Sequence, residues 1–261
     1  MSNGKKPAKP GEEAAAMTTK PAILIVGADK GGVGKTTITR TILDYLAARN
    51  VLVRAFDTEC PRGTLKRFHS NVTEVVDITS APDQMRIIDT LNTSEVKMTV
   101  IDVRAGLLAT TLVALTDIGF FQAVEEGEFN FGLFHVLGPS VASLAEIADV
   151  FPYTGGKNYF LVKNFINETS YFEWHPDIYE NYFKKLKDQV EMITIPKLNE
   201  LAYEQVELAG VPFSAFSKNK DTQGQPANNS LVLRGYVRTW LNNISEEYDR
   251  AAALDWATTT H

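Results

Sequence analysis

The sequence has few of the residues that build disulfide frameworks, metal cages or histidine-based active sites. It contains one cysteine, Cys60, among 261 residues. A lone cysteine cannot form an internal disulfide, and a dimer sharing one iron–sulfur cluster would need two cysteines from each subunit. The four histidines have no ligand-like spacing; they are His69, His135, His175 and His261. A protein metal cage and a histidine-based nucleophilic triad therefore have no support.

Long apolar segments are also missing. No stretch is long enough to span a bilayer, and no apolar signal-peptide core stands near the start. We therefore expect a soluble, cytoplasmic protein. Hydrophobic residues make up 44% of the chain and charged residues 22%, a mixture that can bury a full core. The formal net charge of −6 disfavours indiscriminate nucleic-acid binding, although a local basic patch across a dimer is compatible with it.

The chain divides into a short polar start and one long globular segment. Residues 1–20 mix Lys, Pro, Gly, Glu and Ala without a periodic apolar face, so we predict a disordered tail there. Residues 21–261 have the length of one α/β domain.

Short apolar runs alternate with longer amphipathic stretches in this segment, which is typical of parallel strands covered on both faces by crossover helices. We predict a doubly wound α/β sheet, mostly parallel and flanked by helices, in a single domain. The helix from Lys35 to about Arg49 should pack on it, and Tyr171–Lys187 should form an inserted helical element at the surface. The strand candidates are Ala22–Gly27, Val51–Phe56, Val75–Thr79, Met98–Asp102, Phe131–Leu137, Tyr159–Lys163 and Glu191–Ile195.

The segment from Ile23 to Thr37 is a hydrophobic strand that leads into a glycine-rich turn and then a helix. Glycines lack a Cβ atom, so the backbone can wrap closely enough for successive N–H groups to point at phosphate oxygens. The start of the helix adds partial positive charge. The phosphate-binding positions expected here are Gly31, Gly32, Val33 and Gly34.

Three side chains at the start of the helix complete this phosphate loop. Lys35 should place its ammonium group on the β- and γ-phosphates of a nucleotide. The hydroxyl of Thr36 should ligate Mg²⁺, and Thr37 should contact the α-phosphate.

The run from Lys30 to Thr37, K-G-G-V-G-K-T-T, resembles the deviant Walker A loop of the ParA/MinD family of ATPases. It departs from the ordinary pattern because Asp29 stands at the first glycine position. In that family a lysine at the position of Lys30 reaches across a dimer to the partner's phosphates, so the resemblance implies a catalytic role for it in trans.

The resemblance extends to two further strand ends. Asp57 and Glu59 match a pair of acids that orients the attacking water in the family, although Glu59 is one methylene longer than the usual Asp. Asp102 ends a buried strand like a Walker B motif and is expected to hold Mg²⁺ through a water molecule. After it the family usually carries Pro-Pro or similar, whereas this chain has Arg104-Ala-Gly106.

Two later positions match the family's adenine site more weakly. Asn164 stands at the place of an adenine-contacting asparagine, and Pro196 follows the strand that meets the base. Pro196 could equally be a strand terminator. Asn219-Lys-Asp221 has its acid one position early for a guanine signature, so ATP is preferred over GTP.

The resemblance implies a homodimer that forms with ATP and separates on hydrolysis, with ATP and Mg²⁺ as cofactors. ParA-like relatives use this switch to bind nonspecific DNA in partitioning or cargo positioning, with a ParB-like partner that stimulates hydrolysis. The candidate DNA contacts are four basic residues, Lys218, Lys220, Arg234 and Arg238.

Three alternatives remain open. One is an ATP-dependent small-molecule enzyme, with Tyr171–Lys187 near its substrate. Another is a MinD-like positioning ATPase at a membrane, which the acid-rich end from Ile244 to Trp256 disfavours. The third is a binding module with degenerate catalysis, for which Glu59 and Arg104 are the signs and an ATPase assay is the test.

Overall fold

The structure is a computed structural model. It describes residues 20–91, 95–155, 157–166, 169–171, 175, 177, 180 and 190–258. The tail expected at 1–20 lies outside the described residues apart from Lys20, and so does most of the insertion expected at Tyr171–Lys187. Within the described part of the chain, no helix combines the length and apolar character that crossing a membrane requires.

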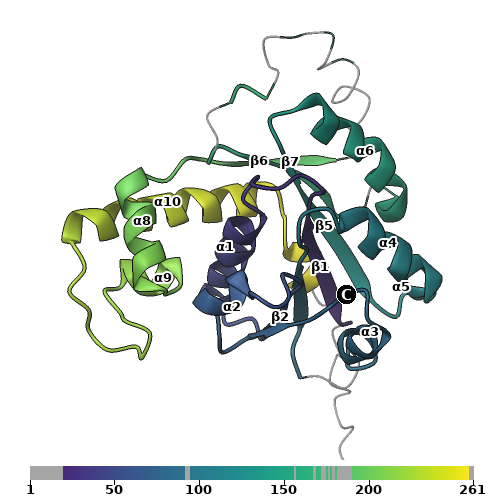
Figure 1. The fold of residues 1–261 in the computed structure, drawn as a ribbon, viewed down its shortest axis with the longest axis horizontal. Helices are drawn as coiled ribbons and strands as arrows, with labels where there is room; N and C mark the ends of the chain where they lie inside the picture. The colour runs from purple at the N-terminus through teal and green to yellow at the C-terminus, as the bar shows by residue number, and fades with distance from the viewer. Residues whose placement is uncertain are drawn as a thin grey trace, which may run out of the picture.

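Seven parallel strands form one sheet, in the order β3-β2-β4-β1-β5-β6-β7 (Figure 1). The predicted doubly wound α/β fold is confirmed, and among the described strands every pairing is parallel rather than only most of them. The strands are β1 (Ala22–Gly27), β2 (Val53–Asp57), β3 (Thr73–Val75), β4 (Met98–Asp102), β5 (Asn130–Leu137), β6 (Tyr159–Asn164) and β7 (Glu191–Ile195).

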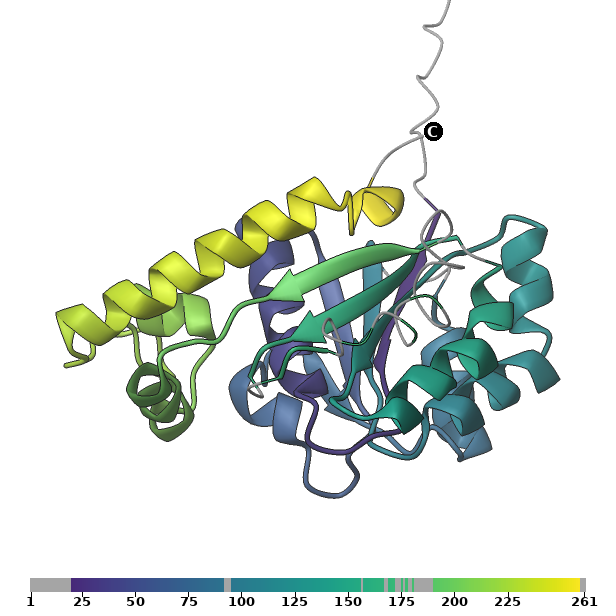
Figure 2. The ribbon, with the colours of Figure 1, turned by 90° about the horizontal axis from the view of Figure 1, so that it is seen from above.

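Helices cover both faces of the sheet (Figures 1 and 2). One face carries α1 (Lys35–Ala48), α2 (Thr64–Phe68), α8 (Glu200–Ala209), α9 (Phe213–Ser217), α10 (Leu231–Arg250) and α11 (Asp255–Thr258). The other face carries α3 (Ala81–Ile88), α4 (Leu108–Asp117), α5 (Phe120–Glu125) and α6 (Val141–Thr154).

The central strand β1 shows why this sequence forms a two-sided sheet. All its residues are buried, and successive side chains enter opposite layers. Leu24 and Val26 pack in the layer that contains α1, whereas Ile23 and Ile25 pack in the layer of α4 and α6. Because side chains alternate across a strand, a continuous apolar run can fill both cores at once.

One predicted strand is misplaced. The run Val75–Thr79 was expected to be extended, but β3 ends at Val75. The carboxylate of Asp77 accepts hydrogen bonds from the backbone N–H and the hydroxyl of Thr79 at 3.0 and 2.6 Å, and Ser80 N–H donates to the Asp77 carbonyl. Such a local turn competes with a strand for the same backbone groups.

The predicted strand Val51–Phe56 also shifts by two residues, because β2 begins at Val53 and Leu52 is exposed. The first helix ends at Ala48, close to the expected Arg49. The bounds predicted for Ala22–Gly27, Met98–Asp102 and Glu191–Ile195 agree with the structure.

Helices α8 and α9 and the first half of α10 extend beyond the sheet as a C-terminal lobe (Figure 2). Two buried polar contacts tie this lobe to α1. The guanidinium of Arg40, 1% exposed, donates to the Glu207 carboxylate at 2.5 Å and lies between the rings of Phe68 and Phe213. One turn later, the buried Asp44 carboxylate accepts a hydrogen bond from the Ser214 backbone N–H.

Candidate nucleotide site

The glycine-rich loop lies at the carboxyl edge of the sheet. It connects β1 to α1, and β1 pairs with β4 on one side and β5 on the other. Gly32 and Gly34 have φ values of 74° and 89°, in the left-handed region that favours glycine. A Cβ atom on Gly34 would lie 2.2 Å from Nδ2 of Asn164, so this position has no room for a side chain. The loop is thus a close-fitting backbone cradle at the start of a helix.

A cavity of about 310 Å³ adjoins the loop. The predicted phosphate, metal and water residues that line it together are Gly32, Gly34, Lys35, Thr36, Thr37, Asp57, Glu59 and Asp102. Three further residues, Val103, Arg104 and Ala105, come from the segment after β4. Strand ends distant in the sequence therefore converge on one space.

Lys35 is mostly buried, and its ammonium group donates to the Lys30 carbonyl at 2.8 Å. Burial lowers its pKa, and the negative charge of Asp102 is the largest influence that opposes this shift. Because the Lys35 ammonium group has one neutral backbone partner, it can exchange that carbonyl for phosphate oxygens, which form stronger, charge-assisted hydrogen bonds. The Lys30 side chain is exposed and makes no hydrogen bond or ion pair with the residues that the structure describes.

Asp102 ends β4 and is only 4% exposed. Its carboxylate accepts a hydrogen bond from the Thr39 hydroxyl at 3.0 Å. Burial raises the pKa of Asp102 to about 7, against the opposing hydrogen bond from Thr36. A buried carboxylate beside a threonine hydroxyl is a hard oxygen donor set, so these two residues fit Mg²⁺.

The two acids after β2 make different contacts. Asp57 accepts hydrogen bonds from three backbone N–H groups, those of Glu59 at 2.9 Å, Leu65 at 2.7 Å and Lys66 at 3.3 Å. Its carboxylate therefore holds the start of α2, and burial raises its pKa. The Glu59 carboxylate accepts a hydrogen bond from the Thr64 hydroxyl and also lines the cavity.

Thr58, between these acids, has a contact that the motif did not indicate. Its hydroxyl donates to the Asp102 carbonyl at 3.1 Å and accepts from the Arg104 backbone N–H at 2.8 Å. It links the ends of β2 and β4. Threonine at this position gave no signal in the sequence, because the contact depends on neighbouring strands in the sheet.

Asp29, the departure from the usual loop, has a defined structural role. Its carboxylate accepts from Leu108 N–H at the start of α4 at 2.9 Å, and its carbonyl accepts from Gly106 N–H at 2.9 Å. Its own N–H donates to Glu146 at 3.1 Å. A carboxylate at a helix start is favoured by the helix dipole.

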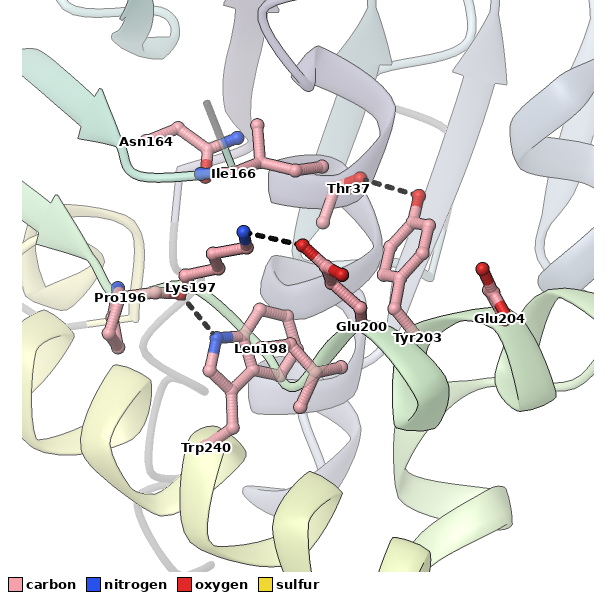
Figure 3. A pocket seen from close by; sticks show the side chains of 10 residues that line it. All are labelled: Thr37, Asn164, Ile166, Pro196, Lys197, Leu198, Glu200, Tyr203, Glu204 and Trp240. Atoms are coloured by element: carbon pink, nitrogen blue, oxygen red, sulfur yellow. Dashed lines mark hydrogen bonds and ion pairs between the residues drawn. The ribbon is translucent and has the colours of Figure 1, made fainter. Parts of the chain in front are cut away.

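A second cavity of about 210 Å³ meets the first at Thr37 (Figure 3). Both predicted base-site residues, Asn164 and Pro196, line it. The amide of Asn164 donates to the Val33 carbonyl at 3.0 Å, so it also supports the phosphate loop. The indole N–H of Trp240 donates to the Pro196 carbonyl at 2.6 Å.

Several residues of this second cavity were not predicted from the sequence. Tyr203 shares a hydrogen bond of 3.4 Å with Thr37, and Lys197 forms an ion pair of 2.7 Å with Glu200 (Figure 3). They come from the segment after β7 and from α8, whose approach to the loop no local pattern shows. The cavity has the mainly apolar walls and few polar groups expected of a small-ligand site.

The basic residues considered for DNA binding gather on the C-terminal lobe. Lys218 and Lys220 are exposed after α9, and Arg234 and Arg238 lie on α10. Arg238 is exposed, although its guanidinium donates to the Ser217 carbonyl at 3.3 Å. The lobe thus brings together positive charges that are separated in the sequence.

The sheet order and the loop between β1 and α1 define a P-loop NTPase-like fold. No protein-family model matches the chain, and no curated protein matches its sequence. Among solved structures, MinD of Pyrococcus horikoshii OT3 complexed with Mg-ADP is 16% identical, with a TM-score of 0.53 over 90% of this chain and 98% of that chain. This likeness shows that the two proteins share a fold.

Two further solved structures are similar. MinD of Aquifex aeolicus is 17% identical, with a TM-score of 0.48 over 85% of this chain and 97% of that chain. A proposed plasmid partition protein of Borrelia burgdorferi B31 bound to AMPPNP is 15% identical, with a TM-score of 0.46 over 88% of this chain and 99% of that chain.

Proposed function

We propose that this chain is an MgATP-binding ATPase of the ParA/MinD family that works as an ATP-dependent dimerisation switch. The observation that carries the proposal is the convergence of the K-G-G-V-G-K-T-T loop with Asp57, Glu59 and Asp102 around one cavity, joined at Thr37 to a second cavity. The MinD protein of Pyrococcus horikoshii, which has this fold, was solved with Mg-ADP.

The loop and Lys35 bind the phosphates. Backbone N–H groups of residues 31–34 surround the β-phosphate, and Lys35 leaves the Lys30 carbonyl to contact phosphate oxygens. Thr37, which lines both cavities, contacts the α-phosphate. The cavity beside Asn164 and Pro196 receives the adenine base.

Thr36 and Asp102 would hold Mg²⁺, Thr36 directly and Asp102 through water. The ion supplies positive charge that offsets charge on the transferring phosphoryl group. Glu59 positions the attacking water. Asp57 holds Glu59 in position, because its carboxylate accepts hydrogen bonds from the backbone N–H of Glu59 and from the start of α2.

Lys30 serves a second copy of the chain. Its exposed ammonium group has no partner among the described residues and stands at the rim of the loop. Across a two-fold interface each copy donates Lys30 to the other's nucleotide, so that dimer formation and hydrolysis are coupled.

Gel filtration of the wild type and the Lys35→Ala variant, with no nucleotide, MgADP and MgATP, tests this function. We expect a wild-type dimer with MgATP alone, and about 100-fold weaker MgATP binding in the variant because a charged phosphate contact is lost. Lys157→Ala, at the opposite edge of the sheet, is the control. A wild-type oligomeric state that does not change when MgATP is added would contradict the switch.

We further propose that the dimer binds nonspecific DNA through the basic residues of the C-terminal lobe, in partitioning or cargo positioning, and that a ParB-like partner stimulates hydrolysis. The clustering of Lys218, Lys220 and Arg238 on one lobe supports this. Retention on nonspecific DNA should require ATP and fall steeply with salt. The Lys218→Ala, Lys220→Ala double variant should lose retention while it still dimerises.

A further inference from the structure

The segment 103–107 after β4 is attached to both of the loops that flank the phosphate cavity. At its start, the Arg104 backbone N–H donates to the Thr58 hydroxyl at 2.8 Å. At its end, Gly106 N–H donates to the Asp29 carbonyl, and Leu108 N–H donates to the Asp29 carboxylate. The segment is therefore fixed relative to the acidic loop on one side and the phosphate loop on the other.

Two departures meet in this arrangement, one from the ordinary phosphate-loop pattern and one from the usual family pattern. Asp29 replaces the first glycine of the loop, and Arg104 stands where proline is usual. The structure brings them to opposite ends of one short segment. Together they place a cation on a fixed backbone beside the cavity.

Arg104 lines the phosphate cavity together with Lys35, Thr36 and Glu59. Its side chain is exposed and makes no hydrogen bond or ion pair within the described ranges. A guanidinium group has five N–H donors in a planar fork that matches phosphoryl oxygens. An arginine without a partner at the rim of a phosphate site is well suited to contact the terminal phosphate.

We propose that Arg104 is a catalytic residue that contacts γ-phosphoryl oxygens within the same chain, and that Asp29 is its positioning residue. The inference rests on the proposed ATPase function. In the reaction a water oxygen bonds to the γ-phosphorus, and the bond to the β–γ bridging oxygen breaks with its electron pair leaving on ADP. The water's proton ends on inorganic phosphate or in solvent. Arg104 stabilises the charge on the transferring group.

The first test compares the wild type with Arg104→Ala and Arg104→Lys. We expect kcat to fall on the order of 1,000-fold in Arg104→Ala, with a smaller loss in Arg104→Lys. The KM for MgATP should change little. Arg86→Ala, an exposed arginine on α3 paired with Glu74, is the matched control and should keep wild-type values.

A binding measurement separates the γ-phosphoryl contact from activity. Calorimetry should show MgADP binding within about 2-fold of wild type in Arg104→Ala, because the contact is absent in ADP. Binding of MgADP with aluminium fluoride, a mimic of the transferring group, should weaken at least about 10-fold. Should Arg104→Ala not fold, Arg104→Gln, which keeps most of the stem, takes its place.

The possible outcomes test the role of Arg104 separately from the proposed ATPase function. Equal kcat and equal fluoroaluminate affinity in the wild type and Arg104→Ala would overturn the role of Arg104 and leave the ATPase function intact. A wild type that binds neither MgADP nor MgATP would overturn the proposed function and this inference with it.

The role of Asp29 is tested by a double-mutant cycle. Asp29→Gly should lower kcat about 10-fold in the wild type but have almost no effect in the Arg104→Ala background, because its contribution acts through Arg104. Asp29→Asn keeps an acceptor for Leu108 N–H and should retain most activity. Additive effects of Asp29→Gly and Arg104→Ala would show that Asp29 acts independently, which a merely structural role predicts.

Discussion

The phosphate end and the base end of the candidate site are built in opposite ways. The phosphate end is one continuous loop, residues 29–37, completed by the ends of β2 and β4. The base end is assembled from β6, the segment after β7, α8 and α10, and it rests on the C-terminal lobe. The first therefore depends on backbone conformation, and the second on how distant helices pack. Substitutions at the two ends should therefore impair nucleotide binding for different reasons.

The largest effect is expected where the C-terminal lobe is tied to α1. Arg40→Ala removes a large buried side chain that packs on Phe68 and Phe213 and pairs with Glu207, so the free energy of unfolding should fall by about 2–5 kcal/mol. Urea unfolding measures it. Arg49→Ala, which breaks an exposed pair with Asp249, should cost below about 1 kcal/mol. A loss of equal size in both variants would show that the lobe does not depend on the buried pair.

At the phosphate end, substitutions that disturb the loop backbone should weaken nucleotide binding. In Gly34→Ala a methyl group meets Nδ2 of Asn164 and the residue keeps a left-handed φ, which together cost about 2–3 kcal/mol and displace Asn164 from Val33. Gly32→Ala meets no atom within 4 Å, so only the backbone cost of about 1 kcal/mol remains. Calorimetric titration with MgADP should rank the two variants in that order; the reverse order would refute the close fit at Gly34.

At the base end, a substitution should reduce affinity less, and it should reduce affinity for ATP and ADP equally. Trp240→Phe removes the donor to the Pro196 carbonyl and costs about 1 kcal/mol, or about 5-fold in affinity for either nucleotide. Lys35→Ala should instead weaken ATP more than ADP. Titration of both nucleotides against both variants makes this comparison. A Trp240→Phe variant that selectively loses ATP would contradict a base-end role.

The last comparison concerns the dependence of stability on pH. Burial raises the pKa of Asp44 to about 6 from an ordinary 3.8. The folded state therefore holds this proton more tightly than the unfolded state, so stability falls as pH rises from about 4 to about 6. In Asp44→Asn this fall should be shallower, so the Tm should change less across that range than in the wild type. Asp117→Asn, exposed on α4, should follow the wild type; identical slopes in all three proteins would exclude Asp44.

The sequence predicted the phosphate end of the site better than the base end. The loop residues and the strand ends at Asp57 and Asp102 could be placed because each lies directly after a buried strand, and parallel strands end at one edge. The contacts of Thr58, Tyr203 and Trp240 could not be placed, since they join residues 44 to 166 positions apart in the chain. The error at β3 has a local cause, the turn at Asp77.

The sequence by itself determined the order of strands and helices, the layered α/β class and the phosphate loop, because hydrophobic periodicity and glycine placement are local properties of the chain. Only the tertiary structure decided how Asp29 and Thr58 meet the segment that carries Arg104, and how the C-terminal lobe closes the base cavity. Those contacts arise when strands take neighbouring places in a sheet and helices pack across it, which depends on side chains far apart in the sequence.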